Sequence, residues 1–291
     1  MSRMPDILCL GAAHWDVIGR SALPVAMGDD LPGVIRTRPG GVALNIAHAL
    51  AGQGLRPALL SAIGQDPEGA ALVAWLDRHG IDTRFLHRPA TLPTDRYLAI
   101  EGPAGLVAAI AESTALEQEG AHILAALRAP ALRAWRGPVV LDSGFAPETL
   151  ADLARSGIAL AAPLRLTSAA PAKAPRLRPF LQSRATFALN RQEAATLLDR
   201  PLPDSMTAAR ALLAAGAARA IITDGPHPAT DADAAQILTL PPPPVAAARV
   251  TGAGDSFLAA HLAAELRGLD RHSALAHALD AAAHHITTTD A

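Results

Sequence analysis

The chain is short of several residue types on which common functional classes depend. Its 291 residues include a single cysteine, Cys9, so no internal disulfide can form, and this count fits a reducing compartment. They also include a single lysine, Lys173, which follows an alanine. A phosphate loop of the Walker type needs the sequence Gly-Lys-Ser/Thr, so this class of nucleotide site is excluded.

An excess of charge and long apolar runs are also missing. The formal net charge is −2 and the sequence pI is about 6.6, which gives no electrostatic basis for binding nucleic acid or an anionic membrane surface. No uncharged apolar run reaches about 18 residues, so we expect no membrane span. The apolar stretch of residues 7–13 is too short for a secretory signal, and we therefore expect a cytoplasmic protein.

Two further signatures of functional sites are absent. A Gly-x-Gly-x-x-Gly turn after the first expected strand would indicate a dinucleotide-dependent oxidoreductase, but Gly11-Ala12-Ala13-His14 does not supply it. The eleven histidines include no His-Glu-x-x-His pair, which is the helical spacing of metalloprotease zinc sites. The sequence therefore supports neither class.

What is present is a regular alternation of short apolar strands and amphipathic helices, in a chain of which 50% is hydrophobic. This alternation predicts an α/β fold with a doubly wound, mostly parallel sheet, in a single domain spanning residues 1–291. Ligands of such sheets bind at the carboxyl ends of the strands. We expect strands at residues 7–11, 58–64, 139–142, 158–162, 186–190 and 220–223, and helices at residues 43–53, 67–79, 147–155, 191–198, 207–218, 256–267 and 273–285.

A few segments interrupt this alternation. Residues 94–100 and 106–111 predict the two strands of a hairpin. Residues 21–38 are rich in proline, glycine and aspartate. Residues 168–179 have low complexity and are expected to form a surface loop, and residues 231–245 are expected to form a loop with at most one edge strand.

The strongest chemical signal is Thr251-Gly252-Ala253-Gly254-Asp255, a turn of small residues that leads directly into a helix. Glycines let the backbone approach a ligand closely, and the free N–H groups of a first helical turn attract an anion such as phosphate. A carboxylate there would repel such a ligand unless it takes a proton from the hydroxyl that attacks the phosphate, which is the role we predict for Asp255. The alternative is that Asp255 only caps a glycine-rich turn.

Two separated motifs resemble those of the ribokinase-like (PfkB) carbohydrate kinase family. One is Gly40-Gly41-Val42-Ala43-Leu44-Asn45-Ile46-Ala47, and the other is the turn of residues 251–255, about 210 residues further along. Between them, Asn190-Arg191-Gln192-Glu193 resembles the family's Asn-x-x-Glu motif. The resemblance covers nearly the whole chain in the right order. It implies a phosphotransferase that acts on an alcohol group and uses ATP and Mg²⁺.

The resemblance implies that the first motif binds the sugar. Gly40 and Gly41 would let the helix start approach a ribose-like ring, and Asn45 would form hydrogen bonds with the ring hydroxyls. Asp16, expected at the end of the first strand, would accept hydrogen bonds from two of these hydroxyls.

A small β lid would close over the sugar and keep water out, so that the sugar hydroxyl receives the phosphoryl group. By resemblance it is formed by residues of about 20–38 and 93–112, the segments that break the alternation. In many family members this lid also forms a dimer contact, so a homodimer is implied.

The resemblance places the nucleotide near the second motif. The N–H groups of the turn Gly252-Ala253-Gly254 would stabilise charge on the transferring phosphoryl group, with Asp255 as the base. Glu193, together with Asn190, would position Mg²⁺ through water, since this ion keeps much of its hydration shell. The implied nucleotide-binding residues are Asn190, Thr223, Gly225, Thr251, Gly252 and Gly254.

The chain departs from the family pattern at three places. His14 stands where members usually have asparagine. Arg249 stands where many members carry Asp or Asn, which weakens the case for activation by a monovalent cation. The nucleotide loop of residues 223–228 lacks the usual second glycine.

Within the family, the stretches around Asp16, Thr94 and Tyr97 are similar to those of bacterial pseudouridine kinases. This similarity implies phosphorylation of the 5′ hydroxyl of pseudouridine, with Thr94 and Tyr97 contacting its base. Ribokinase, another nucleoside kinase and a sugar-phosphate kinase remain alternatives. So does a non-catalytic sugar or nucleotide sensor, although a pure binding protein would gain little from Asp255 beside phosphate.

Overall fold

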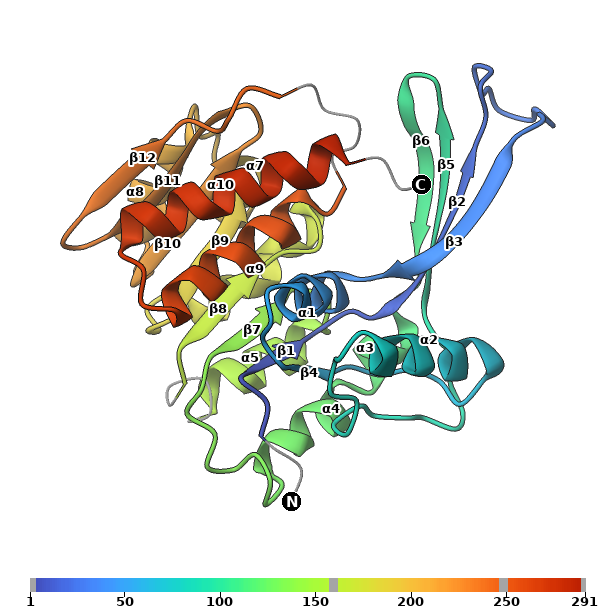
Figure 1. The fold of residues 1–291 in the computed structure, drawn as a ribbon, viewed down its shortest axis with the longest axis horizontal. Coiled ribbons are helices and arrows are strands. Elements are labelled where there is room, and N and C mark those ends of the chain that lie inside the picture. The colour runs from blue at the N-terminus through green and yellow to red at the C-terminus, as the bar shows by residue number, and fades with distance from the viewer. Residues whose placement is uncertain (1–3, 157–161, 246–250, 289–291) are drawn as a thin grey trace.

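The body of the protein is an eight-stranded sheet (Figure 1), seen in a computed structural model that describes residues 4–156, 162–245 and 251–288. Its strands are β1 (Ile7–Leu10), β4 (Pro57–Leu60), β7 (Val139–Asp142), β8 (Leu164–Thr167), β9 (Thr186–Asn190), β10 (Arg219–Asp224), β11 (His227–Asp233) and β12 (Ile237–Leu240). Their order is β12-β11-β10-β9-β8-β7-β1-β4, and only the two pairings at the β11–β12 end are antiparallel. The predicted α/β fold with a mostly parallel sheet is confirmed.

Helices cover both faces of this sheet and create two apolar cores. The helical elements are α1 (Val42–Gly52), α2 (Pro67–Arg78), α3 (Thr114–Gln118), α4 (Gly120–Ala125), η1 (Ala126–Arg128), α5 (Pro147–Arg155), η2 (Pro171–Phe180), α7 (Arg191–Leu197), α8 (Ser205–Ala214), α9 (Ala253–Leu266) and α10 (Arg271–Thr287). On β1, Leu8 and Leu10 join the core that contains residues of α5, η2, α7 and α8. Ile7 and Cys9 join the core that contains residues of α1, α2, α9 and α10. Because β1 is buried on both faces, its sequence is a continuous apolar run.

A second, four-stranded sheet projects from the body beside α1 (Figure 1). Its strands are β2 (His14–Arg20), β3 (Val34–Gly40), β5 (Arg96–Gly102) and β6 (Gly105–Ala111), in the order β3-β2-β5-β6. Strands β5 and β6 form the predicted hairpin, whereas β2, which pairs with both β3 and β5, was not predicted. None of the helices in the part of the chain that the structure describes is both long enough and apolar enough to cross a membrane.

The prediction of a surface loop at residues 168–179 is wrong. This segment contains η2, a 3₁₀ helix in which Ala174, Leu177 and Phe180 are all buried. A 3₁₀ helix has three residues per turn, so apolar residues spaced by three lie on one side of it. The sequence pattern was present, but its period differs from that of the α-helix.

The prediction of a loop with at most one edge strand at residues 231–245 is also wrong, because β11 and β12 both contribute to it. The polar character of this segment has a structural cause. Asp231 is fully buried in β11, where it accepts hydrogen bonds from Arg219 at 2.8 Å and from Arg271 at 2.6 Å. The strand predicted at residues 158–162 lies almost entirely outside the described residues.

Candidate active site

The two glycine-rich motifs meet where α1 lies against α9. The side-chain amide of Asn45, on α1, donates a hydrogen bond of 2.9 Å to Oδ2 of Asp255, a residue 210 positions further along. Asp255 lies in the first turn of α9, whose N-terminal cap is Gly252. Gly252 has a φ of 86°, a left-handed conformation that favours glycine. The sharp turn places a carboxylate beside the free N–H groups of a helix start.

The surroundings of Asp255 oppose ionisation of its carboxyl group. Desolvation of this partly buried side chain raises its pKa to about 7, and the negative charges of Asp142, Glu193 and Asp16 act in the same direction. The hydrogen bond from Asn45 acts in the opposite direction. A carboxyl with a pKa near neutrality can both accept and release a proton at pH 7, as a general base requires.

Asp16 does not follow the first strand, as predicted, but lies within β2 of the small sheet. The chain leaves the large sheet at Gly11, whose φ is 146° and where a Cβ would lie 2.0 Å from Oδ2 of Asp142. Asp16 is almost fully buried, with His14 Nε2 at 3.2 Å from Oδ1 and Arg38 Nε at 3.5 Å from Oδ2. Because the chain passes from the large sheet to the small one, Asp16 lies in the small sheet, beside the start of α1.

Gly40 and Gly41 are both required by close packing. A Cβ on Gly40 would lie 2.3 Å from Oδ1 of Asp16, and a Cβ on Gly41 would lie 2.4 Å from the carbonyl oxygen of Ala12. Gly41 also has a φ of 100°. These two glycines thus allow β2, the turn after β1 and the start of α1 to come together.

If Asp16 binds a sugar, as the family resemblance implies, a Gly40→Ala substitution is expected to raise KM for that substrate by about 10–100-fold, because the added methyl would displace the Asp16 carboxylate and weaken the hydrogen bonds that it accepts. Steady-state kinetics with the sugar as the varied substrate measure this effect. Gly52→Ala is the matched control, since no atom lies within 4 Å of its added Cβ. An unchanged KM in Gly40→Ala would contradict a role of Asp16 in sugar binding.

The two residues predicted to contact the base of a nucleoside differ in their accessibility. Thr94 is fully buried, and its hydroxyl and backbone N–H donate to Asp66 at 2.8 and 2.6 Å. Thr94 therefore fixes Asp66, the N-terminal cap of α2, and its side chain is closed to solvent. Tyr97 lies opposite Asp16 in the β2–β5 register and is partly exposed. Desolvation raises the pKa of Tyr97, and the nearby Asp16 adds to the effect.

Asn190 and Glu193 form a reciprocal cap at the start of α7. Oδ1 of Asn190 accepts from the N–H of Glu193, and Oε2 of Glu193 accepts from the N–H of Asn190, both at 2.8 Å. Glu193 is nearly buried, and desolvation raises its pKa to about 7. Thr223 pairs with Asn190 in the β9–β10 register, and Gly225, with a φ of 57°, turns the chain after β10. These residues lie together at the carboxyl ends of two neighbouring strands, where ligands of such sheets bind.

Asp142, at the carboxyl end of β7, is a residue of this site that the sequence analysis did not single out. Its carboxylate accepts hydrogen bonds from the backbone N–H groups of Ala12 at 2.7 Å, Gly144 at 2.7 Å and Ala43 at 3.2 Å. Burial raises the pKa of Asp142. Asp142 thereby ties the turn after β1 and the start of α1 to the central strand. Its position as a lone acid at the end of an apolar strand was a signal in the sequence.

His285, on α10, supports the turn that precedes Asp255. Its Nε2 donates to the carbonyl oxygen of Thr251 at 3.0 Å, and a Cβ on Gly252 would lie 2.8 Å from the same nitrogen. Thr251 is exposed, as is Gly254. Arg249, on which the weakened case for monovalent-cation activation depends, lies outside the described residues.

Comparison with known protein families gives a match over almost the entire chain. A family model described as pfkB family carbohydrate kinase matches residues 4–291. The pseudouridine kinase of Escherichia coli is 39% identical over 75 residues, which cover 26% of this chain and 24% of that protein. The acarbose 7(IV)-phosphotransferase of an Actinoplanes species is 35% identical over 107 residues, which cover 36% of this chain and 35% of that protein. The matched stretches thus span well under two thirds of these curated relatives.

Solved structures match along the full chain. A carbohydrate kinase from Agrobacterium tumefaciens is 26% identical with a TM-score of 0.82, and the match covers 98% of this chain and 92% of that one. The Arabidopsis thaliana ribokinase, solved with ribose and ATP, is 19% identical with a TM-score of 0.81, and the match covers 99% of this chain and 95% of that one. At this lower identity the likeness establishes the fold.

Proposed function

The chain belongs to the pfkB family of carbohydrate kinases, and from that membership we propose that it transfers the γ-phosphoryl group of ATP to the 5′ hydroxymethyl oxygen of a ribose-containing nucleoside. The observation that carries this proposal is the contact between Asn45 and Asp255, which joins the sugar motif to the anion-binding turn at 2.9 Å. It holds a carboxyl group with a pKa of about 7 at the start of α9.

In the proposed reaction, Asp255 accepts the proton of the hydroxymethyl group as its oxygen attacks the γ-phosphorus. The N–H groups at the start of α9, including those of Ala253 and Gly254, stabilise the charge that develops on the transferring phosphoryl group. Asp16 and Asn45 orient the sugar by hydrogen bonds to its hydroxyls. Thr223, Gly225 and Thr251 are the proposed contacts of the nucleotide.

The residues present also fit a magnesium ion bound through water. Glu193 supplies a carboxylate at the carboxyl end of β9, close enough to Asp255 to raise its pKa, and Mg²⁺ prefers oxygen ligands and retains several waters. The ion would neutralise charge on the nucleotide phosphates. Because Asn190 and Glu193 already hold each other in the α7 cap, the cap would fix the carboxylate in place for this contact.

Pseudouridine is the first candidate substrate. The match to the Escherichia coli pseudouridine kinase supports it, and Tyr97, which is partly exposed and opposite Asp16, is the proposed contact of its base. Thr94 is not part of this proposal, because it is fully buried. Ribokinase-like activity on a free sugar is the alternative.

The test is ADP release with ATP and Mg²⁺ over a panel of pseudouridine, uridine, adenosine, ribose, fructose and fructose 6-phosphate. We expect pseudouridine to give the highest kcat/KM. A higher kcat/KM on another compound of the panel would support kinase activity but contradict the proposal that Tyr97 recognises the base of pseudouridine. Sugar binding without any turnover would favour a non-catalytic sensor instead.

The small sheet is proposed as the lid of this site, and its outer face as a homodimer contact. Asp16 and Tyr97 lie on one face of that sheet, whereas Leu98, Ile100 and Ile110 lie on the other, because neighbouring residues of a strand point to opposite sides. These three apolar side chains are exposed by 44–68%. Sedimentation equilibrium is expected to give a dimer that Ile110→Glu converts to a monomer.

The activity is expected to rise with pH through neutrality. Because Asp255 must be ionised to accept a proton and its pKa is about 7, kcat/KM should fall about tenfold for each pH unit below that value and level off above it. The measurement is the pH profile of kcat/KM between pH 5.5 and 8.5 with saturating Mg²⁺-nucleotide. A profile that is already flat at pH 5.5 would contradict a base with a raised pKa.

A further inference from the structure

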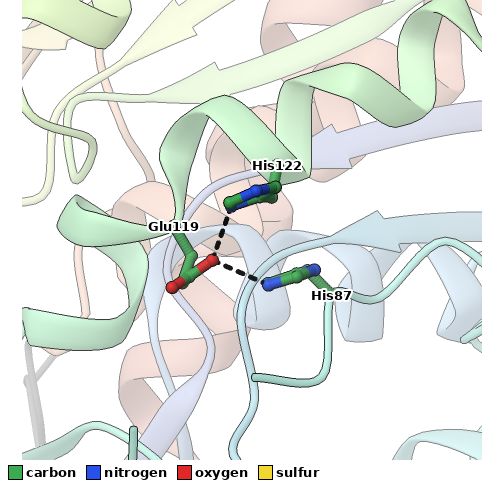
Figure 2. A group of neighbouring side chains, drawn as sticks. All are labelled: His87, Glu119 and His122. Carbon is green, nitrogen blue, oxygen red and sulfur yellow. Dashed lines mark hydrogen bonds and ion pairs between the residues drawn. The ribbon is translucent and has the colours of Figure 1, made fainter. Parts of the chain in front are cut away.

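Two histidines and a glutamate, none of which is assigned to the proposed active site, form a cluster (Figure 2). His87 precedes β5 in the chain, Glu119 lies between α3 and α4, and His122 belongs to α4. Oε2 of Glu119 lies 2.8 Å from Nε2 of His87 and 2.7 Å from Nδ1 of His122. The three ligand atoms all lie within 4.8 Å of one another.

The chemistry of these side chains is that of a transition-metal site. Two imidazole nitrogens and one carboxylate oxygen form a ligand set that zinc uses, at distances of about 2.0–2.2 Å. In a tetrahedral site such ligands lie about 3.3 Å from one another, so the two contacts of Glu119 need to open by only about 0.5 Å. The two imidazole nitrogens, which lie within 4.8 Å of each other, must come to the same separation, and rotation of the exposed His122 side chain can bring them closer.

The backbone around the cluster is already held in place. The N–H of His87 donates to Ser61 at 2.9 Å and its carbonyl oxygen accepts from Ile63 at 3.0 Å, so this residue continues the edge of the large sheet. The backbone of Glu119 closes helical hydrogen bonds of 3.0 Å to both Ala115 and Ile123. A site whose ligands come from rigid elements loses little conformational entropy when an ion binds.

The cluster is open to solvent on one side. The His122 side chain is 70% exposed and that of His87 is 30% exposed, whereas Glu119 is 17% exposed. The two imidazole rings are nearly parallel, with an angle of 11° between their planes, and both turn toward the carboxylate (Figure 2). An ion can therefore reach the three donors from solvent and keep water in its remaining position.

We propose that His87, Glu119 and His122 bind one divalent transition-metal ion of the zinc class, with water as a further ligand. The ion joins residue 87 to residues 119–122 and so closes the segment that contains the β5–β6 hairpin. Its effect is structural, because it fixes the start of α4 to the segment at residue 87, which continues the edge of the large sheet.

The test is titration of the metal-free full-length protein with Zn²⁺ by calorimetry and with Co²⁺ by visible absorption. We expect one equivalent to bind, with absorption bands of a low-symmetry four- or five-coordinate Co²⁺ complex. Thermal unfolding should shift upward by about 5 °C at a Zn²⁺ concentration of 100 times Kd. His122→Ala, on an exposed side chain, should lose at least about 90% of the affinity and the thermal shift.

His272→Ala is the matched control, because His272 is also an exposed helical histidine but lies at the start of α10. It should bind Zn²⁺ and Co²⁺ as the unchanged protein does. Equal loss of binding in His122→Ala and Glu119→Gln, without loss in His272→Ala, supports the site. Binding that survives in both cluster variants, or no stoichiometric binding below about 100 μM metal, overturns it. Both readouts are independent of kinase activity.

Discussion

Replacing Asp255 with asparagine is expected to lower kcat by about 10²–10⁴-fold, the range for loss of a positioned general base. Asparagine retains an oxygen that can accept the hydrogen bond from Asn45, which is 2.9 Å long in the structure, so the geometry of the helix start should persist. What is lost is the ability to accept a proton. Single-turnover measurements of phosphoryl transfer separate this loss from changes in binding or product release.

The stability of Asp255→Asn serves as its control. In the folded protein the pKa of Asp255 is raised from 3.8 to about 7, so the native state binds more protons than the unfolded state between these values. Stability therefore decreases as the pH rises through this window, and asparagine removes that loss. We expect the variant to be at least as stable as the unchanged protein at pH 8, as measured by urea unfolding. Unchanged phosphoryl transfer in a folded variant would reject Asp255 as the base.

Replacing Asp142 with alanine is expected to lower the free energy of unfolding by about 3 kcal/mol, because it leaves buried backbone donors without an acceptor. The carboxylate accepts from Ala12, Ala43 and Gly144, and it is fully buried. The turn after β1 and the start of α1 would both lose their attachment to β7. We therefore expect KM for the sugar to rise together with the loss of stability, measured by urea unfolding and steady-state kinetics.

Asp142→Asn provides a milder variant, since it keeps one acceptor oxygen. Its stability should lie between those of the unchanged protein and Asp142→Ala. Asp152→Ala on α5 is the control, because Asp152 is an exposed acid that pairs with the neighbouring surface residue Arg155, and it should change stability by less than about 0.5 kcal/mol. If Asp142→Ala unfolds at the same urea concentration as this control, the three hydrogen bonds contribute nothing measurable to stability.

Much of the large sheet could be predicted from sequence, because its strands are short apolar runs separated by helices of period 3.6. The predictions failed for two segments. One has a hydrophobic period other than 3.6, and the other is polar because its side chains pair inside the protein. Residues 174–180 follow the period of three of a 3₁₀ helix. Strand β11 is polar because Asp231 pairs with Arg219 inside the body. Neither the rarer period nor the distant partner is visible in a local pattern.

The candidate site shows the same division. The glycines at positions 40, 41 and 252 could be singled out from sequence, since each stands in a motif, and the structure gives each a close contact that a Cβ would block. The partner of the Thr94 hydroxyl could not be seen in the sequence, because Asp66 lies 28 positions away. The sequence marks Asp142 as a lone acid at the end of an apolar strand, but its partners are backbone N–H groups, which no residue type identifies, so its role follows only from the structure.

By itself, the sequence determined the α/β fold, the resemblance to a kinase family and the identity of the candidate base, because helical and strand periods and glycine-rich turns are local properties. Only the tertiary structure decided that Asn45 touches Asp255, that three other carboxylates help to raise the Asp255 pKa to about 7, and that His87 lies beside Glu119 and His122. Electrostatic and hydrogen-bond energies depend on distances in space, and in a folded chain those distances do not follow separation along the sequence.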